Sequence, residues 1–329
     1  MVQYDKPFKT YAELIEQLRD KYGLIINDDS FATQTLATFS YYDLINGYKE
    51  CFMTEDRFIE GTSIENLHSF HVFDRSLQSI ILKQSIYIET ILKTKLAYAI
   101  SKNIGISEDI YLSKSKFVDH KRRKSLSKVL ESIESAKTRS IKYNQQPITH
   151  YYNTKNHIPP WILFKNISFG NAIDLYSFLK EPSKNEVAHA LLPQDIEYED
   201  KVFFSIQALQ TIKKYRNVIA HNLKFIACKA DNAAPAKTLV SLSNKALISW
   251  SDIKKSRVRL NNIYALILQI IIMLDDNYLK ASFLVELFNH FESEQGKVIS
   301  DFYCTAAELP SDFAKRIERY LQFLLETNP

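Results

Sequence analysis

The sequence predicts an all-α fold, and three observations support this prediction. Glycine is scarce, with 6 among 329 residues, which disfavours β-sandwiches punctuated by glycine turns. Apolar residues recur at intervals of three and four over long stretches, the period of an amphipathic helix. Several stretches begin with Ser or Thr followed three residues later by Glu, the pattern of a helix capping box. Helices therefore account for most of the expected structure.

The first 60 residues are expected to form an N-terminal helical segment (1–60). Thr10 and Glu13 make a capping box for a helix that ends at Gly23. Ser30 can cap a second short helix, which leads to the turn signal Asn46-Gly47.

A core domain is expected over residues 61–225. It begins with a capping box at Thr62-Ser63-Ile64-Glu65 and a long helical pattern that reaches about Ile100, with a break near Asp74. Residues 114–142 are predicted as an inserted basic helix, because apolar residues recur there at i, i+3, i+4 and i+7.

The second half of this domain contains three more expected helices. One spans Trp161 to Leu179 with a kink or break at Gly170, and a short one ends at Pro193. The apolar pattern from about Tyr198 predicts a long helix whose last turns carry Arg216 and His221.

After residue 225 the pattern of apolar residues in the sequence changes. The apolar, β-branched stretches between 224 and 250 predict a small β-hairpin or three-stranded patch. Helices are expected to follow over about 252–275, 278–293 and 310–326. The third segment (226–329) is therefore read as a small β-hairpin plus a C-terminal helical extension.

Several classes of function are disfavoured by composition. The cysteines Cys51, Cys228 and Cys304 are isolated, so they form no disulfide framework and no metal-binding knuckle. No phosphate-binding glycine loop, nucleophile elbow or dinucleotide fingerprint is present, and we expect no metal and no cofactor. The longest apolar run, Ala265 to Leu274, is about half a membrane span. With no signal-peptide pattern at the N-terminus, a cytoplasmic protein without membrane contact is expected.

The net charge of +4 is modest, but its distribution is uneven. The stretch from Lys114 to Lys142 contains ten basic residues and three acidic ones, and no acidic residue occurs from Thr211 to Lys229. Segregated positive charge suits an RNA backbone, although solvated helix faces are the better explanation for any one cluster taken singly. The candidate RNA-binding residues are Lys121, Arg122, Arg123, Lys124, Lys213, Lys214, Lys254, Lys255, Arg257 and Arg259.

The candidate catalytic residues lie in the stretch Tyr215 to His221, at the end of the long helix. Arg216 supplies a fixed cation for a phosphate, and His221 supplies a group that moves protons. Asn217 lies four residues before His221 on the same helical face and can orient the imidazole. These are the groups needed to cut RNA without a metal, through attack of the 2′-hydroxyl on the adjacent phosphate.

One histidine cannot easily act as both the base and the acid of this reaction. No second Arg and His at this spacing exists in the chain, so catalysis would require a homodimer that brings two copies together. The alternative is purely structural, with Arg216 paired to a carboxylate and His221 complementing the dipole at the helix end.

Taken together, six short segments resemble the abortive-infection (Abi) proteins of the AbiD/AbiF type, which carry a HEPN domain. They span roughly residues 5–225 in the expected order. The segments are Phe39-Ser40-Tyr41-Tyr42 through Ile45-Asn46-Gly47-Tyr48; Phe73-Asp74-Arg75 with Leu77; Ile88-Glu89 through Lys95-Leu96-Ala97-Tyr98; Pro160-Trp161; Ser168-Phe169-Gly170 with Leu175-Tyr176; and Arg216-Asn217 through Ala220-His221-Asn222.

The resemblance implies a HEPN-type helical bundle and a metal-independent endoribonuclease that leaves 2′,3′-cyclic phosphates, with Arg216, Asn217 and His221 as its motif. It also implies homodimerisation, a toxin-like role in phage defence and a small non-coding RNA partner. Glu89 and Lys93 match a secondary HEPN motif, or else form an ordinary i, i+4 ion pair. Asn222 departs from many AbiD-type members, which carry a second histidine there.

Two alternatives remain open from sequence. A catalytically silent HEPN dimer could bind a small non-coding RNA as a module or scaffold. A helical protein-interaction subunit would need no RNA at all.

Overall fold

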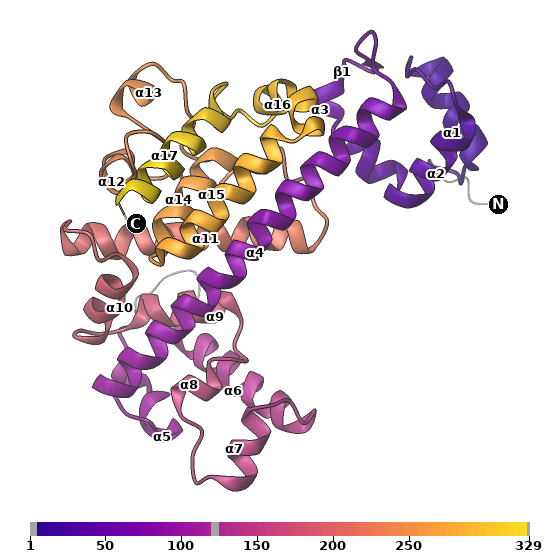
Figure 1. Ribbon diagram of the computed structural model, residues 1–329. Coiled ribbons are helices and arrows are strands. Elements are labelled where there is room, and N and C mark those ends of the chain that lie inside the picture. The colour runs from indigo at the N-terminus through magenta and orange to yellow at the C-terminus, as the bar shows by residue number, and fades with distance from the viewer. Residues whose placement is uncertain (1–4, 120–124, 328–329) are drawn as a thin grey trace.

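The computed structural model describes residues 5–119 and 125–327 of the chain. Its fold is all-α with a small two-stranded hairpin, which confirms the predicted fold class (Figure 1). One hydrophobic core runs through residues of all three predicted segments. The segment boundaries at 60 and 225 stay predictions.

Short elements form the N-terminal part, at the upper right of Figure 1. The Thr10 hydroxyl accepts a hydrogen bond from the Glu13 N–H, and the Glu13 carboxylate accepts one from the Thr10 N–H, so the predicted capping box is present. The elements are α1 (Tyr11–Glu16), η1 (Gln17–Lys21), α2 (Asp29–Phe39), η2 (Tyr42–Asn46), α3 (Lys49–Phe52), β1 (Met53–Thr54) and β2 (Arg57–Phe58).

Helix α4 (Ile64–Asn103) is the axis of the molecule and crosses it from end to end (Figure 1). Its 40 residues make a rod about 60 Å long at 1.5 Å per residue. Ser63 caps it, one residue later than the sequence pattern suggested. The expected break near Asp74 is absent, because this buried carboxylate accepts hydrogen bonds from Tyr48, Gln78 and Tyr303 inside the core. A polar residue that is satisfied in this way leaves the helix intact.

A lower lobe surrounds the C-terminal half of α4 (Figure 1). The predicted basic helix is present as α6, whose residues Val129, Leu130 and Ile133 are buried. Ser168 caps α9, so the chain breaks just before Phe169 instead of at Gly170. The lobe contains α5 (Glu108–Tyr111), η3 (Lys114–Lys116), α6 (Leu126–Lys142), α7 (Ile148–Thr154), α8 (Pro160–Leu163) and α9 (Phe169–Phe178).

Helix α11 (Tyr198–Ala220) packs against α4, α9, α10 (Ser183–Leu191) and α14 (Ile263–Met273). It begins at the residue that the apolar pattern predicted, and Phe204, Leu209 and Ile212 are buried along it. Because the helix is held on several sides, the position of its C-terminal end is well defined.

The small hairpin lies at Met53–Phe58. The prediction of a hairpin between residues 224 and 250 is therefore wrong. Pro235 precedes α12, where the fixed backbone angle of proline suits a helix start. Leu239, Leu247 and Ile248 are buried, and α12 packs against α14, so packing overrides the β-like composition. The remaining elements are α12 (Ala236–Leu242), α13 (Trp250–Lys254), α15 (Asn277–Glu292), α16 (Glu294–Ala306) and α17 (Phe313–Thr327).

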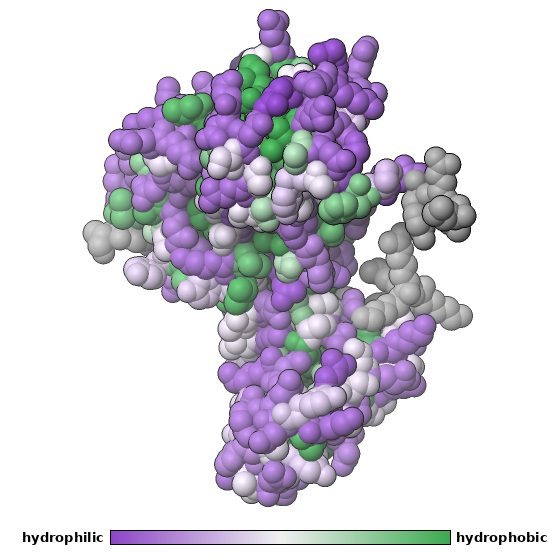
Figure 2. All heavy atoms as spheres, turned by 90° about the vertical axis from the view of Figure 1, so that its right-hand side faces the viewer, coloured by the Kyte–Doolittle hydropathy of each residue, from purple (hydrophilic) through white to green (hydrophobic). Residues whose placement is uncertain are grey.

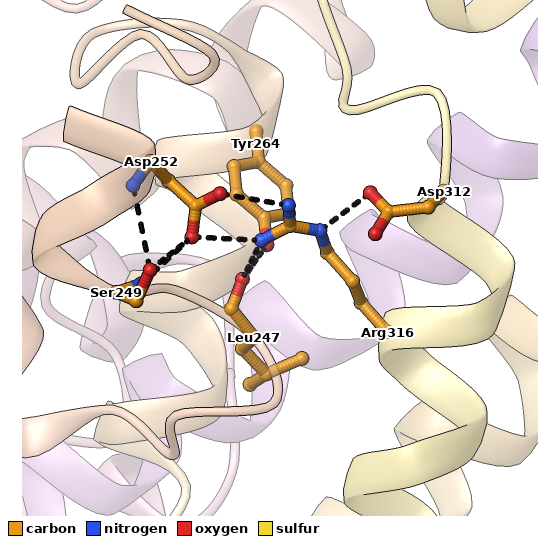
Figure 3. A network of polar contacts seen from close by, with 6 residues as sticks. All are labelled: Leu247, Ser249, Asp252, Tyr264, Asp312 and Arg316. Carbon is orange, nitrogen blue, oxygen red and sulfur yellow. Dashed lines mark hydrogen bonds and ion pairs between the residues drawn. The ribbon is translucent and has the colours of Figure 1, made fainter. Parts of the chain in front are cut away.

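A buried ion pair joins α17 to the loop and helix around α13 (Figure 3). Arg316 donates to both carboxylate oxygens of Asp252, at 2.9 and 3.1 Å, and to the Leu247 carbonyl at 2.8 Å. Asp312 accepts a further bond at 2.6 Å. Asp252 also closes the capping box of α13 with Ser249. The Asp252 side chain therefore links the start of α13 to α17.

The space-filling view shows an upper body and a lower lobe joined by a narrower waist (Figure 2). Hydrophilic side chains cover most of this face, and hydrophobic ones gather mainly on the upper body (Figure 2). In the part of the chain that the structure describes, no helix combines the length and apolar character needed to cross a bilayer.

Candidate functional site

Arg216 extends from the last turns of α11 with 38% of its side chain exposed. Its Nη1 donates to the Asn217 side-chain oxygen at 3.2 Å. A guanidinium has five N–H donors, and within residues 5–119 and 125–327 this is the only hydrogen bond that it makes. Donors on the exposed edge of Arg216 are therefore available for an anion.

Glu89 and Lys93 of α4 lie beside this guanidinium. The Lys93 Nζ is 2.7 Å from Glu89 Oε1, and the Arg216 Nη2 is 4.0 Å from Glu89 Oε2. The Glu89 and Lys93 side chains are only 16% and 14% exposed. One carboxylate is thus shared by two cations, which leaves a net positive charge at the site. The two sequence motifs, 127 residues apart from Glu89 to Arg216, meet in space.

His221 is the first residue after α11, and its backbone N–H donates to the Asn217 carbonyl at 3.0 Å. The imidazole is exposed. It makes no hydrogen bond to any residue that the structure describes. Such an imidazole is free to accept or donate a proton to a bound molecule.

The Asn217 side chain makes no hydrogen bond to the imidazole of His221 among the residues that the structure describes. Its side-chain oxygen accepts the hydrogen bond from Arg216 instead. The amide therefore positions the cation, whereas the sequence suggested that it would orient the histidine.

The chain that leaves α11 is anchored to the N-terminal part. Asn222 adopts a left-handed conformation (φ 55°) and donates from Nδ2 to Asp43 Oδ2 at 2.7 Å. Lys224 pairs with Glu50 at 3.0 Å. Sequence reasoning missed Asp43 and Glu50 as positioning residues, since they lie more than 170 positions away. The available signal was that Asp43 falls inside the segment Phe39 to Tyr48 that carries the family resemblance.

The predicted RNA-binding residues that the structure describes do not form one surface. Lys213 is half-buried on α11, Lys214 is paired with Asp231 at 2.5 Å, and Arg259 lies 3.3 Å from Glu308. Lys254, Lys255 and Arg257 are exposed at α13, at the far end of Figure 1 from α6. Lys121, Arg122, Arg123 and Lys124 lie outside the described residues.

Metal ligands were also sought among the described residues. Residues 5–119 and 125–327 contain no group of three or more His, Cys, Asp or Glu side chains placed to hold a metal ion. The side chains that the structure does bring together are two cations and a shared carboxylate, and the exposed His221 follows Arg216 by five residues. They can bind a phosphate and transfer a proton.

Comparison with known proteins gives one family. A family model described as Abi-like protein matches residues 34–227, which is 194 of the 329 residues. The match includes α4, α11 and every residue of the site. No curated protein and no solved structure matches the chain.

Proposed function

The chain belongs to the Abi-like family of abortive-infection proteins, and on this premise we propose that it is a phage-defence endoribonuclease of the HEPN type that needs no metal. The observation that carries the proposal is the meeting of Arg216 with the Glu89–Lys93 pair, five residues before the exposed His221 on the chain that ends α11. This arrangement puts cationic donors and a proton-transfer group at one helix end.

In the proposed reaction, the 2′-oxygen of a ribose attacks the adjacent phosphorus. A base removes the proton of the 2′-hydroxyl, the bond from phosphorus to the 5′-oxygen breaks, and an acid protonates that oxygen. The products are a 2′,3′-cyclic phosphate and a 5′-hydroxyl end. Arg216 and Lys93 stabilise the extra negative charge on the phosphorane, and His221 carries one of the two protons.

A second copy of the chain is proposed to supply the other imidazole. The Arg216 motif contains a single histidine, His221, and acid and base must act at opposite sides of the phosphorus. Exposed apolar side chains flank the motif residues: Leu223 follows His221 by two positions, and Ile86 precedes Glu89 by three. A two-fold contact would cover these side chains and place the two helix ends face to face.

The test is expression of the wild type beside Arg216→Ala and His221→Ala in bacteria, with growth and new 5′-hydroxyl RNA ends measured by sequencing. Only the wild type is expected to arrest growth and create such ends. His150→Ala, which removes an exposed histidine 71 positions before His221 in the chain, is the matched control and should behave as wild type. Purified protein should cut RNA equally well with excess chelator.

Two results would contradict the proposal. Unchanged cleavage by His221→Ala would remove the assigned proton-transfer group. A wild type that binds RNA but cuts none, even with phage present, would favour the catalytically silent RNA-binding module instead.

A further inference from the structure

A cavity of about 140 Å³ opens beside the end of α11, between η2 and the first half of α4. Three segments that carry the family resemblance meet there. Asn222, which follows His221 in the chain, is part of the cavity wall. The lining residues are Tyr42, Asp43, Gly47, Tyr48, His71, Asp74, Arg75, Gln78, Asn222, Leu223, Lys224 and Phe225.

Asp74 and His71, the buried residues that we call the floor of the cavity, are hydrogen-bonded. Asp74, which is 1% exposed, accepts hydrogen bonds from Tyr48 at 2.9 Å, Gln78 at 2.6 Å and Tyr303 at 2.5 Å. His71 Nδ1 lies 3.2 Å from the Tyr48 hydroxyl. Burial lowers the pKa of His71 to about 4, so this imidazole is neutral at physiological pH. The floor holds the groups of the wall in place.

Arg75 is a cation of this wall without a carboxylate partner. Its Nη1 donates to Gln78 Oε1 at 2.7 Å. Within the ranges that the structure describes, no acidic side chain lies within 4.0 Å of the guanidinium. The remaining N–H donors of Arg75 can therefore bind an acceptor in the cavity.

Asp43 presents an acceptor in the same wall. Its Oδ2 accepts hydrogen bonds from Asn222 at 2.7 Å and Ser40 at 3.2 Å. Oδ1 accepts none from any described residue. Tyr42, at the rim, is 65% exposed and offers an aromatic face. A donor, an acceptor and an aromatic ring around a small cavity are the elements with which proteins hold an unstacked base.

We propose that this cavity is a base-reading subsite of the ribonuclease, which takes the nucleobase next to the scissile phosphate. The proposal rests on the proposed function. Asp43 Oδ1 accepts from a ring N–H of the base, Arg75 donates to the neighbouring carbonyl, and Tyr42 stacks on the ring. Guanine and uracil present a ring N–H beside a carbonyl, whereas adenine and cytosine do not, so the subsite prefers guanine or uracil.

Binding is the first test, because it does not depend on catalysis. Fluorescein-labelled cytidine octamers with a single central G, U, A or C are titrated against full-length His221→Ala protein. We expect the G or U octamer to bind about fivefold more tightly than the A and all-C octamers. In the Asp43→Asn and Arg75→Gln backgrounds this preference should fall below about twofold.

Ser40→Gly is the matched control, since it removes the Ser40–Asp43 hydrogen bond but keeps the carboxylate, and glycine suits the left-handed conformation of this residue (φ 61°). Ser40 does not line the cavity, and the variant should retain the base preference. Loss of preference in Ser40→Gly as well as Asp43→Asn would mean that Asp43 only supports the local structure, and would overturn the proposal. Equal binding of all four octamers would overturn it too.

The outcome separates this proposal from the nuclease proposal. Base-selective binding by a protein whose wild type cuts nothing would keep the subsite and reject the nuclease. Cleavage by the wild type with no preference for G or U beside the cut would keep the nuclease and reject the subsite.

Discussion

Arg216 shares the carboxylate of Glu89 with Lys93. Glu89 is its nearest carboxylate at 4.0 Å, but the same carboxylate holds Lys93 at 2.7 Å. A fully paired arginine would have little affinity left for a phosphate, whereas a shared carboxylate orients both cations without neutralising them. This difference separates the functional interpretation of the motif from the purely structural one.

We predict that Glu89→Gln separates binding from catalysis. Removing a negative charge next to two cations strengthens the attraction for RNA, so KM should fall about twofold to fivefold. Without the carboxylate, Arg216 and Lys93 lose their common anchor, and kcat should fall about tenfold. Both constants follow from initial rates on a short RNA.

The matched control for this variant is Glu134→Gln, which breaks the i, i+3 pair with Lys137 at 2.6 Å on α6. It should leave KM and kcat within about twofold of wild type, because an exposed pair contributes little. An unchanged kcat in Glu89→Gln would show that Glu89 does not position the two cations.

Helix α4 contributes to several parts of the molecule. Through Arg75, its N-terminal half lines the cavity proposed as a base-reading subsite, and its middle supplies Glu89 and Lys93. The lower lobe packs on its C-terminal half. Because a helix is stiff, these parts keep a constant spacing of 1.5 Å per residue.

Helix α17 depends on one buried ion pair, and we predict a large stability loss in Arg316→Met. The substitution leaves the Asp252 carboxylate buried without its cation, which costs about 3 kcal/mol of the free energy of unfolding. Urea denaturation followed by circular dichroism measures this loss. The exposed neighbour Arg319→Met should change the free energy by less than about 0.5 kcal/mol.

The double variant Arg316→Met/Asp252→Asn should regain part of the loss, since Asn keeps the cap of Ser249 and removes the unpaired charge. If the double variant is as unstable as the sum of two large single effects, the ion pair is not the cause. The pair also has a defined pH window. Arg316 lowers the pKa of Asp252 from 3.8 to about 2, so its contribution is complete above pH 3.8 and is lost as the pH falls through about 2.

At the scale of the whole molecule, the site is open on the side where α11 ends. His221, Asn222 and Leu223 are all exposed there, and the motif contains a single imidazole. A second molecule would complete both the chemistry and the apolar cover.

We predict that Leu223→Glu converts a dimer into a monomer. Leu223 is 58% exposed beside the motif, and two glutamates facing each other across a two-fold axis would repel. Light scattering coupled to gel filtration measures the mass, and cleavage should fall about a hundredfold with it.

Val298→Glu is the control, because Val298 on α16 is 84% exposed but far from the motif in the chain. It should leave mass and activity unchanged. A Leu223→Glu protein that is monomeric and fully active would contradict catalysis by a dimer, and a monomeric wild type would do so directly.

The sequence alone predicted the local features of this protein. The capping box at Thr10, the start of α11 at Tyr198 and the amphipathic face of α6 follow from patterns within one or two helical turns. Arg216 and His221 were proposed as site residues from their spacing, and Glu89 and Lys93 from the family resemblance; their roles stay predictions. Such features depend on neighbouring residues, and the sequence contains those neighbours in order.

Only the tertiary structure decided which distant segments meet. The sharing of Glu89 between Lys93 and Arg216 depends on the packing of α4 against α11. The contact of Asp43 with Asn222 likewise joins segments 179 positions apart. The hairpin expected after residue 225 became helix because burial against α14 outweighed a weak β preference. Long-range packing and burial set these outcomes, and neither is encoded in the spacing of residues along the chain.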